Sequence, residues 1–101
     1  MKIKRYVGKP TIISAMIWDG SDESTKTVLE FMNIDSQNIP EEIQIHLDSI
    51  PKVLPVTTLE GIIYASPGDY IIKGTLGEHW ACKPEAFNNR YEEDNNEKII
   101  D

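Results

Sequence analysis

The pattern of apolar and polar positions predicts an extended segment over residues 3–18, interrupted at residues 7–10 by Gly8 and Pro10. Residues 11–18 (TIISAMIW) are mostly apolar or β-branched, and apolar side chains fall on both alternating faces. A strand with two apolar faces is typical of a position covered on both sides or central in a sheet. Asp19-Gly20 is a turn signal that ends the strand.

An amphipathic helix is predicted from about residue 22 to 33. Val28, Leu29, Phe31 and Met32 form an apolar stripe at helical spacing, and the face with Leu29 and Met32 is expected to pack on the sheet. Residues 21–24 (SDES) supply an N-cap and acidic residues for the first turn, where the helix dipole favours negative charge.

The second half of the chain reads as short strands separated by turns. Residues 43–48 (IQIHLD) alternate strictly and predict a strand with Ile43, Ile45 and Leu47 facing inward. Pro55 favours an edge position for the next strand, because proline cannot donate to a ladder. The remaining strands are expected at residues 53–58, 62–66, 70–73 and 78–82.

The turns between these strands carry recognisable residues. Pro67-Gly68 is the signature of a type II turn, and Gly74 to Gly77 closes a hairpin. Pro84 suits the first turn of a short C-terminal helix. We therefore expect an α+β fold, with one antiparallel sheet of about five strands, one main amphipathic helix packed on it and a short C-terminal helical turn.

Acidic and basic residues are unevenly distributed along the chain. The 101 residues contain 17 acidic and 10 basic side chains, a net charge of −7. Residues 1–10 carry four bases and no acid, whereas residues 92–101 carry five acids and one lysine, so residues 11–91 keep a charge of −7 by themselves. An acidic folded body argues against duplex nucleic acid as a partner, unless the basic arm acts alone.

Length and composition predict one compact domain over residues 1–91, followed by an acidic, disordered tail over 92–101. Neither an apolar run long enough to span a membrane nor a convincing signal peptide is visible. The single cysteine cannot form an internal disulfide, which favours a reducing compartment, and we expect the cytoplasm.

One block of the sequence resembles a known family. Residues 65–74 (ASPGDYIIKG), 77–78 (GE), 82–87 (CKPEAF) and 91–92 (YE) are similar to the motifs of small phage and prophage proteins named for a PGDYG-type motif. Lys9-Pro10, Ala15, Trp18 and residues 58–61 (TLEG) extend the likeness. Ala81 replaces a frequent proline, and residues 33–53 form a longer segment than is usual. The resemblance implies a phage or prophage origin, with the host cytoplasm as location, and an α+β fold, but no particular activity.

Asp69 is the first candidate site residue, because it follows the Pro67-Gly68 turn and precedes a strand. It could act as a general base or bind a ligand. The structural interpretation, that its carboxylate bonds nearby backbone N–H groups, is favoured because no second carboxylate, His or Cys completes a catalytic set within the motif.

Aromatic residues and lysines on the strands are the second candidate. They could stack and neutralise a nucleotide-type ligand, with Tyr70 expected inward and Lys73 outward; core packing under lysine stems is the structural alternative. The binding candidates are Trp18, Asp69, Tyr70, Lys73, Trp80 and Lys83.

His46, His79 and Cys82 match no zinc signature, and residues three apart on a strand face opposite sides, so we expect neither a metal nor a cofactor. Cys82 is expected to be a small core residue.

These observations favour a non-enzymatic binding module that acts on a host or phage protein with a basic surface. Mimicry of the charge of DNA is one version of this hypothesis. A small-molecule binder is the alternative, and an enzyme using Asp69 with His79 or Tyr70 is a third. No membrane partner is expected, and open strand edges make a homodimer plausible.

Overall fold

The computed structural model describes residues 2–94 and shows an α+β fold. The elements are β1 (Ser14–Trp18), α1 (Asp22–Phe31), α2 (Glu41–Leu47), β2 (Leu54–Thr58), β3 (Gly61–Ala65), β4 (Asp69–Lys73), β5 (His79–Cys82) and α3 (Pro84–Arg90). The acidic tail expected at 92–101 lies outside the described residues from residue 95 onward.

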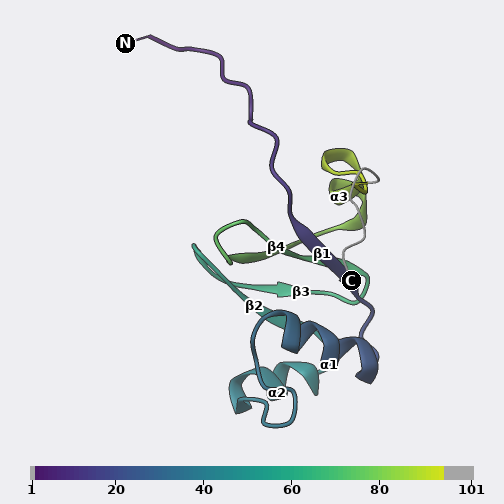
Figure 1. The fold of residues 1–101 in the computed structure, drawn as a ribbon. Coiled ribbons are helices and arrows are strands. Elements are labelled where there is room, and N and C mark those ends of the chain that lie inside the picture. Colours follow the sequence, from purple (N-terminus) through teal and green to yellow (C-terminus); the bar gives the residue numbers. More distant parts are fainter. Residues whose placement is uncertain (1, 95–101) are drawn as a thin grey trace.

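The strands form two antiparallel sheets and not the single sheet expected from the sequence. One has the order β1-β4-β5, and the other is the hairpin β2-β3 (Figure 1). β1 pairs with β4 from Ser14 opposite Lys73 to Trp18 opposite Asp69. β1 is therefore an edge strand, which corrects the central or doubly covered position predicted for it, and its outward Ile17 is 47% exposed.

Helix α1 confirms the prediction of an amphipathic helix near residues 22–33. The Ser21 hydroxyl accepts the backbone N–H of Ser24 at 3.1 Å and caps the helix. Asn33 adopts φ of 64° just beyond the C-terminus, where a left-handed residue commonly ends a helix. The apolar stripe delivers Val28, Leu29 and Met32 to the core.

Residues 43–48 are not a strand, because Glu41–Leu47 form the helix α2. The run satisfies two periods at once: alternation places Ile45 inward, whereas a helix groups Ile43 with Leu47. Leu47 is buried and Ile43 half-buried, while Ile45 is 56% exposed. Pro40 before the helix and two glutamates in its first turn suit a helix start, so the helical period prevails.

The core lies between the three-stranded sheet, the hairpin and the first two helices. Trp18 and Ile71 contribute from the sheet and Leu54, Val56 and Ala65 from the hairpin, all with no exposed surface. Because Ile71 faces this core, its neighbour Tyr70 points to the opposite face, where α3 covers it. The expected orientation of Tyr70 and Lys73 is thus wrong, since Lys73 shares the core face with Ile71.

The predicted turns are present. The backbone N–H of Asp69 donates to the carbonyl of Ser66 at 3.0 Å across Pro67-Gly68, and Gly68 has φ of 101°, as a type II turn requires. Gly74 and Gly77 close the β4–β5 hairpin, with the N–H of Gly77 donating to the Gly74 carbonyl at 3.1 Å.

The N-terminal arm, defined here as residues 2–13, belongs to no helix or strand. Figure 1 shows it running away from the domain beyond the start of β1. Its side chains contribute nothing to the core: Ile3 and Val7 are each 94% exposed and Tyr6 is 87% exposed. Within residues 2–94, these apolar side chains of the arm therefore pack against no other element.

Candidate binding surface

Two of the candidate residues from the sequence, Asp69 and Lys83, are in direct contact. The Lys83 ammonium lies 3.0 Å from Oδ1 and 3.1 Å from Oδ2 of Asp69, and Oδ2 also accepts the backbone N–H of Ser66 at 2.9 Å. Asp69 is only 5% exposed. Both carboxylate oxygens therefore have partners that fix the Pro67-Gly68 turn and its junction with α3.

Trp18 lies on the same face of the sheet, opposite Asp69 in the register, and has no exposed surface. Its indole N–H donates to the Thr25 hydroxyl at 2.8 Å. The ring is thus held between β1 and α1 as part of the core and presents no surface on which a ligand could stack.

The other candidates point in different directions. The Lys73 ammonium lies 5.2 Å from the centre of the Phe31 ring. Tyr70 stacks on Phe87 of α3, with ring centres 3.7 Å apart and planes within 2°. The ring of Phe87 in turn lies beside that of Tyr91, with ring centres 5.0 Å apart. Trp80 lies on the Tyr70 face of the sheet, so the candidates form no single concave surface.

A different surface lies along β3. Ile62, Ile63 and Tyr64 are 58%, 37% and 54% exposed, and no charged residue interrupts the strand. Among residues 2–94, β3 forms a hydrogen-bonded ladder only with β2, so no strand is paired with its other edge, although β5 packs near the hairpin. We call Ile62, Ile63 and Tyr64 with this unpaired backbone the β3 edge.

The hairpin geometry determines which backbone groups face outward. The two-residue loop Leu59-Glu60 joins Thr58 to Gly61, and Pro55, which has no N–H, lies opposite Tyr64. Hydrogen-bonded pairs alternate along an antiparallel ladder, and proline suits the non-bonded positions. The N–H and C=O groups of Ile62 and Tyr64 therefore point away from β2 and are available to another strand.

A cavity opens on each face of the hairpin beside this edge. The first, the helix-side cavity, has a volume of about 370 Å³, and its walls include Met32, Ile43, Ile62 and Tyr64. Its polar groups come from Glu42, Thr57, His46 and His79. The His46 ring lies 5.0 Å from that of Tyr64, and its Nδ1 lies 2.9 Å from the Glu42 carbonyl.

The second, the tryptophan-side cavity, also measures about 370 Å³. Ile63, Leu59 and Trp80 supply apolar surface, and Glu60 and Glu78 supply negative charge. Glu78 Oε1 accepts the backbone N–H of Leu76 at 3.0 Å, which fixes the carboxylate at the β4–β5 hairpin. Neighbouring residues of β3 thus line different cavities: Ile62 and Tyr64 the first, Ile63 the second.

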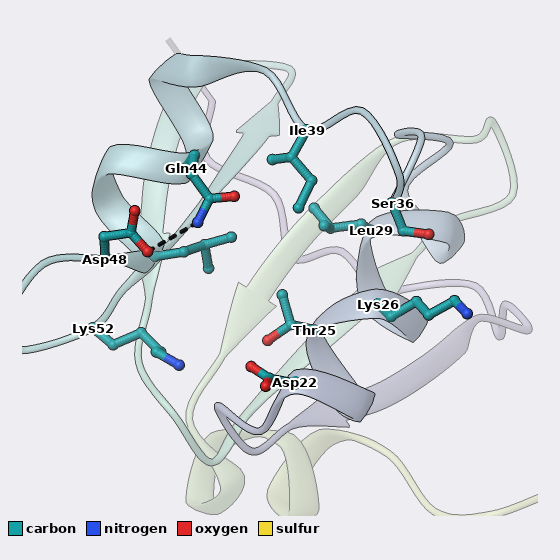
Figure 2. A pocket seen from close by; sticks show the side chains of 10 residues that line it. Asp22, Thr25, Lys26, Leu29, Ser36, Ile39, Gln44, Asp48 and Lys52 are labelled. Carbon is teal, nitrogen blue, oxygen red and sulfur yellow. Dashed lines mark hydrogen bonds between the residues drawn. The ribbon is translucent and has the colours of Figure 1, made fainter.

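A third cavity, of about 270 Å³, lies between α1 and α2 (Figure 2). Its charges are balanced, with Asp22 and Asp48 against Lys26 and Lys52. Lys52 donates to the Gly20 carbonyl at 3.0 Å, and Gln44 donates to Asp48 at 2.9 Å. The first bond joins the segment after α2 to the turn before α1, and the second lies within α2 and its C-cap.

The histidines and the cysteine form no metal site. His46 lies on α2, and Nε2 of His79 is 3.3 Å from the Phe31 carbonyl. In the described part of the chain, no group of three His, Cys, Asp or Glu side chains could hold a metal ion. Burial raises the pKa of the half-buried Cys82 thiol, which disfavours the reactive thiolate.

Residues 62–64 (IIY), which form the β3 edge, are predicted from the sequence only as part of an ordinary strand. Three consecutive large apolar residues leave one face of a strand apolar whichever way it packs. Such a run is also consistent with a buried strand, so the sequence alone does not identify β3 as an exposed edge.

Comparisons with protein-family models, with curated proteins and with solved structures give no significant match. Among the described residues, no helix has the length and apolar character needed to cross a membrane.

Proposed function

We propose that this protein is a small, non-enzymatic binding module that binds an extended segment of a protein partner along the β3 edge. The observation that carries the proposal is the unpaired, uncharged strand with three exposed apolar side chains. Native proteins protect exposed edges with charge, proline or cover, and an added strand satisfies such an edge.

The two cavities support this mode of binding. Side chains of an added strand point alternately to the two faces of the sheet, so successive residues of a bound segment would enter the helix-side and the tryptophan-side cavities. Backbone hydrogen bonds to Ile62 and Tyr64 supply affinity, and the cavities supply specificity.

Charge defines the partner's chemistry. Glu42 lines one cavity and Glu60 and Glu78 the other, and residues 11–91 carry −7. A segment that alternates basic and apolar side chains complements this edge, and opposite charge accelerates its encounter with the module. This agrees with the basic partner surface expected from composition.

The resemblance to PGDYG-motif phage and prophage proteins supports a host or phage protein in the host cytoplasm as the binding partner. The residues of that motif, including Pro67, Gly68 and Asp69, form the turn leading into β4. In this proposal they have a structural role.

Binding of a small molecule is the second candidate function. The helix-side cavity supports it, because aromatic, imidazole and carboxylate groups converge on largely apolar walls. Tyr64 and His46, in place of the strand lysines, would contact the ligand. A thermal-shift series with nucleotides tests it: stabilisation must grow with ligand concentration and vanish in Tyr64→Ala.

The peptide proposal is tested with the ¹⁵N-labelled protein and a synthetic hexapeptide of alternating lysine and valine. We expect the amide signals of Ile62 and Tyr64 to shift, and Ile62→Lys to weaken binding at least tenfold. Ile45→Lys is the matched control, since Ile45 is 56% exposed against 58% for Ile62 and lines neither cavity. Equal binding by both variants, or no shift along β3 at millimolar peptide, refutes the proposal.

A further inference from the structure

The N-terminal arm has the chemistry that the β3 edge requires. Residues 2–7 read KIKRYV, so an extended arm places Ile3, Arg5 and Val7 on one face and Lys4 and Tyr6 on the other. Each face thus offers at least one apolar or aromatic side chain and one base. Each cavity beside the β3 edge likewise offers an apolar wall and at least one glutamate.

The backbone of the arm also has a conformation suited to strand addition. It is extended, lies outside every element, and exposes Ile3, Tyr6 and Val7 almost completely. Pro10 cannot donate in a ladder, which limits the pairing segment to the residues before it. Six residues of strand span about 20 Å, enough to cover the five residues of β3.

The direction of the arm favours a second molecule as its receptor. Figure 1 shows the arm leaving the domain at the start of β1, so the chain would have to reverse to reach its own β3. Reciprocal exchange between two copies needs no reversal, and it closes a two-fold dimer in which each copy gives one arm and accepts one.

We propose that the partner of the β3 edge is the N-terminal arm of a second copy of this chain. Residues 2–7 add as a strand beside β3, pairing with the outward groups of Ile62 and Tyr64, and the basic side chains approach Glu42, Glu60 and Glu78. This inference rests on the proposed function, because it uses the same edge and cavities.

The test measures the mass of the full chain by sedimentation velocity across a dilution series. We expect a dimer that dissociates on dilution and weakens with added salt, since salt screens the arm's charges. Tyr6→Pro removes a backbone donor in the middle of the pairing segment and should weaken association at least tenfold. Thr11→Pro, in the exposed arm outside residues 2–7, is the control and should associate as the unsubstituted protein does.

Ile62→Lys tests the receptor edge, with Ile45→Lys as its control. Loss of association in both Tyr6→Pro and Ile62→Lys supports the arm exchange, provided that their unfolding midpoints equal that of the unsubstituted protein at a concentration at which it is monomeric. Association that survives Ile62→Lys refutes it, because the arm then uses another surface. A monomer whose β3 amide protection falls in Tyr6→Pro also refutes it, since the arm then binds its own chain.

Failure of this inference is distinguishable from failure of the proposed function. A protein that is monomeric at every concentration, yet binds the lysine–valine hexapeptide along β3, excludes the second copy and retains the binding module. A monomer that binds no hexapeptide refutes both. The hexapeptide experiment is repeated in Tyr6→Pro, so that a bound arm cannot mask the edge.

Discussion

Lys83 and Asp69 form an ion pair between partners of very different exposure: the Asp69 side chain is 7% exposed and the Lys83 side chain 66%. The aspartate also accepts the backbone N–H of Ser66 within its own turn. The pair therefore joins the Pro67-Gly68 turn to the residue that precedes α3, and the two partners contribute unequally to the fold.

We expect Asp69→Ala to lower the free energy of unfolding by about 2 kcal/mol, because it removes both the ion pair and the acceptor of the half-buried Ser66 backbone N–H. Lys83→Met leaves the nearly buried Asp69 carboxylate without its counter-ion but keeps its hydrogen bond from Ser66, so we expect a smaller loss than for Asp69→Ala. Urea unfolding of the two variants checks this. Equal losses would show that the ion pair, and not the turn hydrogen bond, stabilises the segment.

Elements defined by neighbouring residues were predictable from the sequence. The Ser21 cap, the helical stripe of α1 and the Pro67-Gly68 turn each depend on side chains within a few positions. α2 was predicted wrongly because Ile43, Ile45 and Leu47 fit both an alternating and a helical period. Only the start signals at Pro40 and the two glutamates distinguish these periods.

The division into two sheets could not be read from local pattern. β1 pairs with β4 across the fifty residues from 19 to 68, and nothing in residues 14–18 identifies that partner. Trp18 became a site candidate for the same reason: an aromatic residue on a strand can face core or solvent, and the sheet pairing decides which. The exposure of Ile62, Ile63 and Tyr64 was unpredictable for the same reason, because it depends on how the hairpin packs.

Trp18 and Thr25 should be energetically coupled through the indole–hydroxyl hydrogen bond of 2.8 Å. Thr25→Val leaves the indole N–H unpaired in the core, for which we expect a loss of about 1–2 kcal/mol. Trp18→Phe removes both that donor and buried volume, and should cost about 2–3 kcal/mol. In a double-mutant cycle by urea unfolding, the double variant should lose less than the sum of the single losses. Strict additivity would contradict the coupling.

Gly20 and Gly77 provide a matched comparison of backbone strain and crowding, with φ of 86° and 82°. A Cβ on Gly20 would lie 3.1 Å from Cγ of Pro67, whereas one on Gly77 meets nothing within 4 Å. Both alanine variants should lose about 1–2 kcal/mol from the left-handed backbone. Gly20→Ala should lose more, because Pro67 lies in the turn that holds Asp69. Thermal unfolding measures both, and equal losses would show that Pro67 moves aside without cost.

Asp19 should make stability depend on pH in the acid range. Hydrogen bonds from the side chain and backbone of Ser21 hold the pKa of the Asp19 carboxyl below its ordinary value of 3.8. Since the pKa is lower in the folded state, the carboxylate stabilises the fold fully above the unfolded value. That contribution is lost as the pH falls through the folded value.

The comparison variant is Asp19→Asn, which keeps an oxygen acceptor for the Ser21 backbone N–H, 2.8 Å from Oδ1 of Asp19, but removes the charge. We expect the unsubstituted protein to melt at a higher temperature than Asp19→Asn at pH 6, and the difference to shrink as the pH is lowered from 6 towards 2. A melting-temperature series across that range, at constant ionic strength, measures it. A difference that stays constant over the series would assign the stabilisation to hydrogen-bond geometry alone, because a contribution from the charge must change with pH.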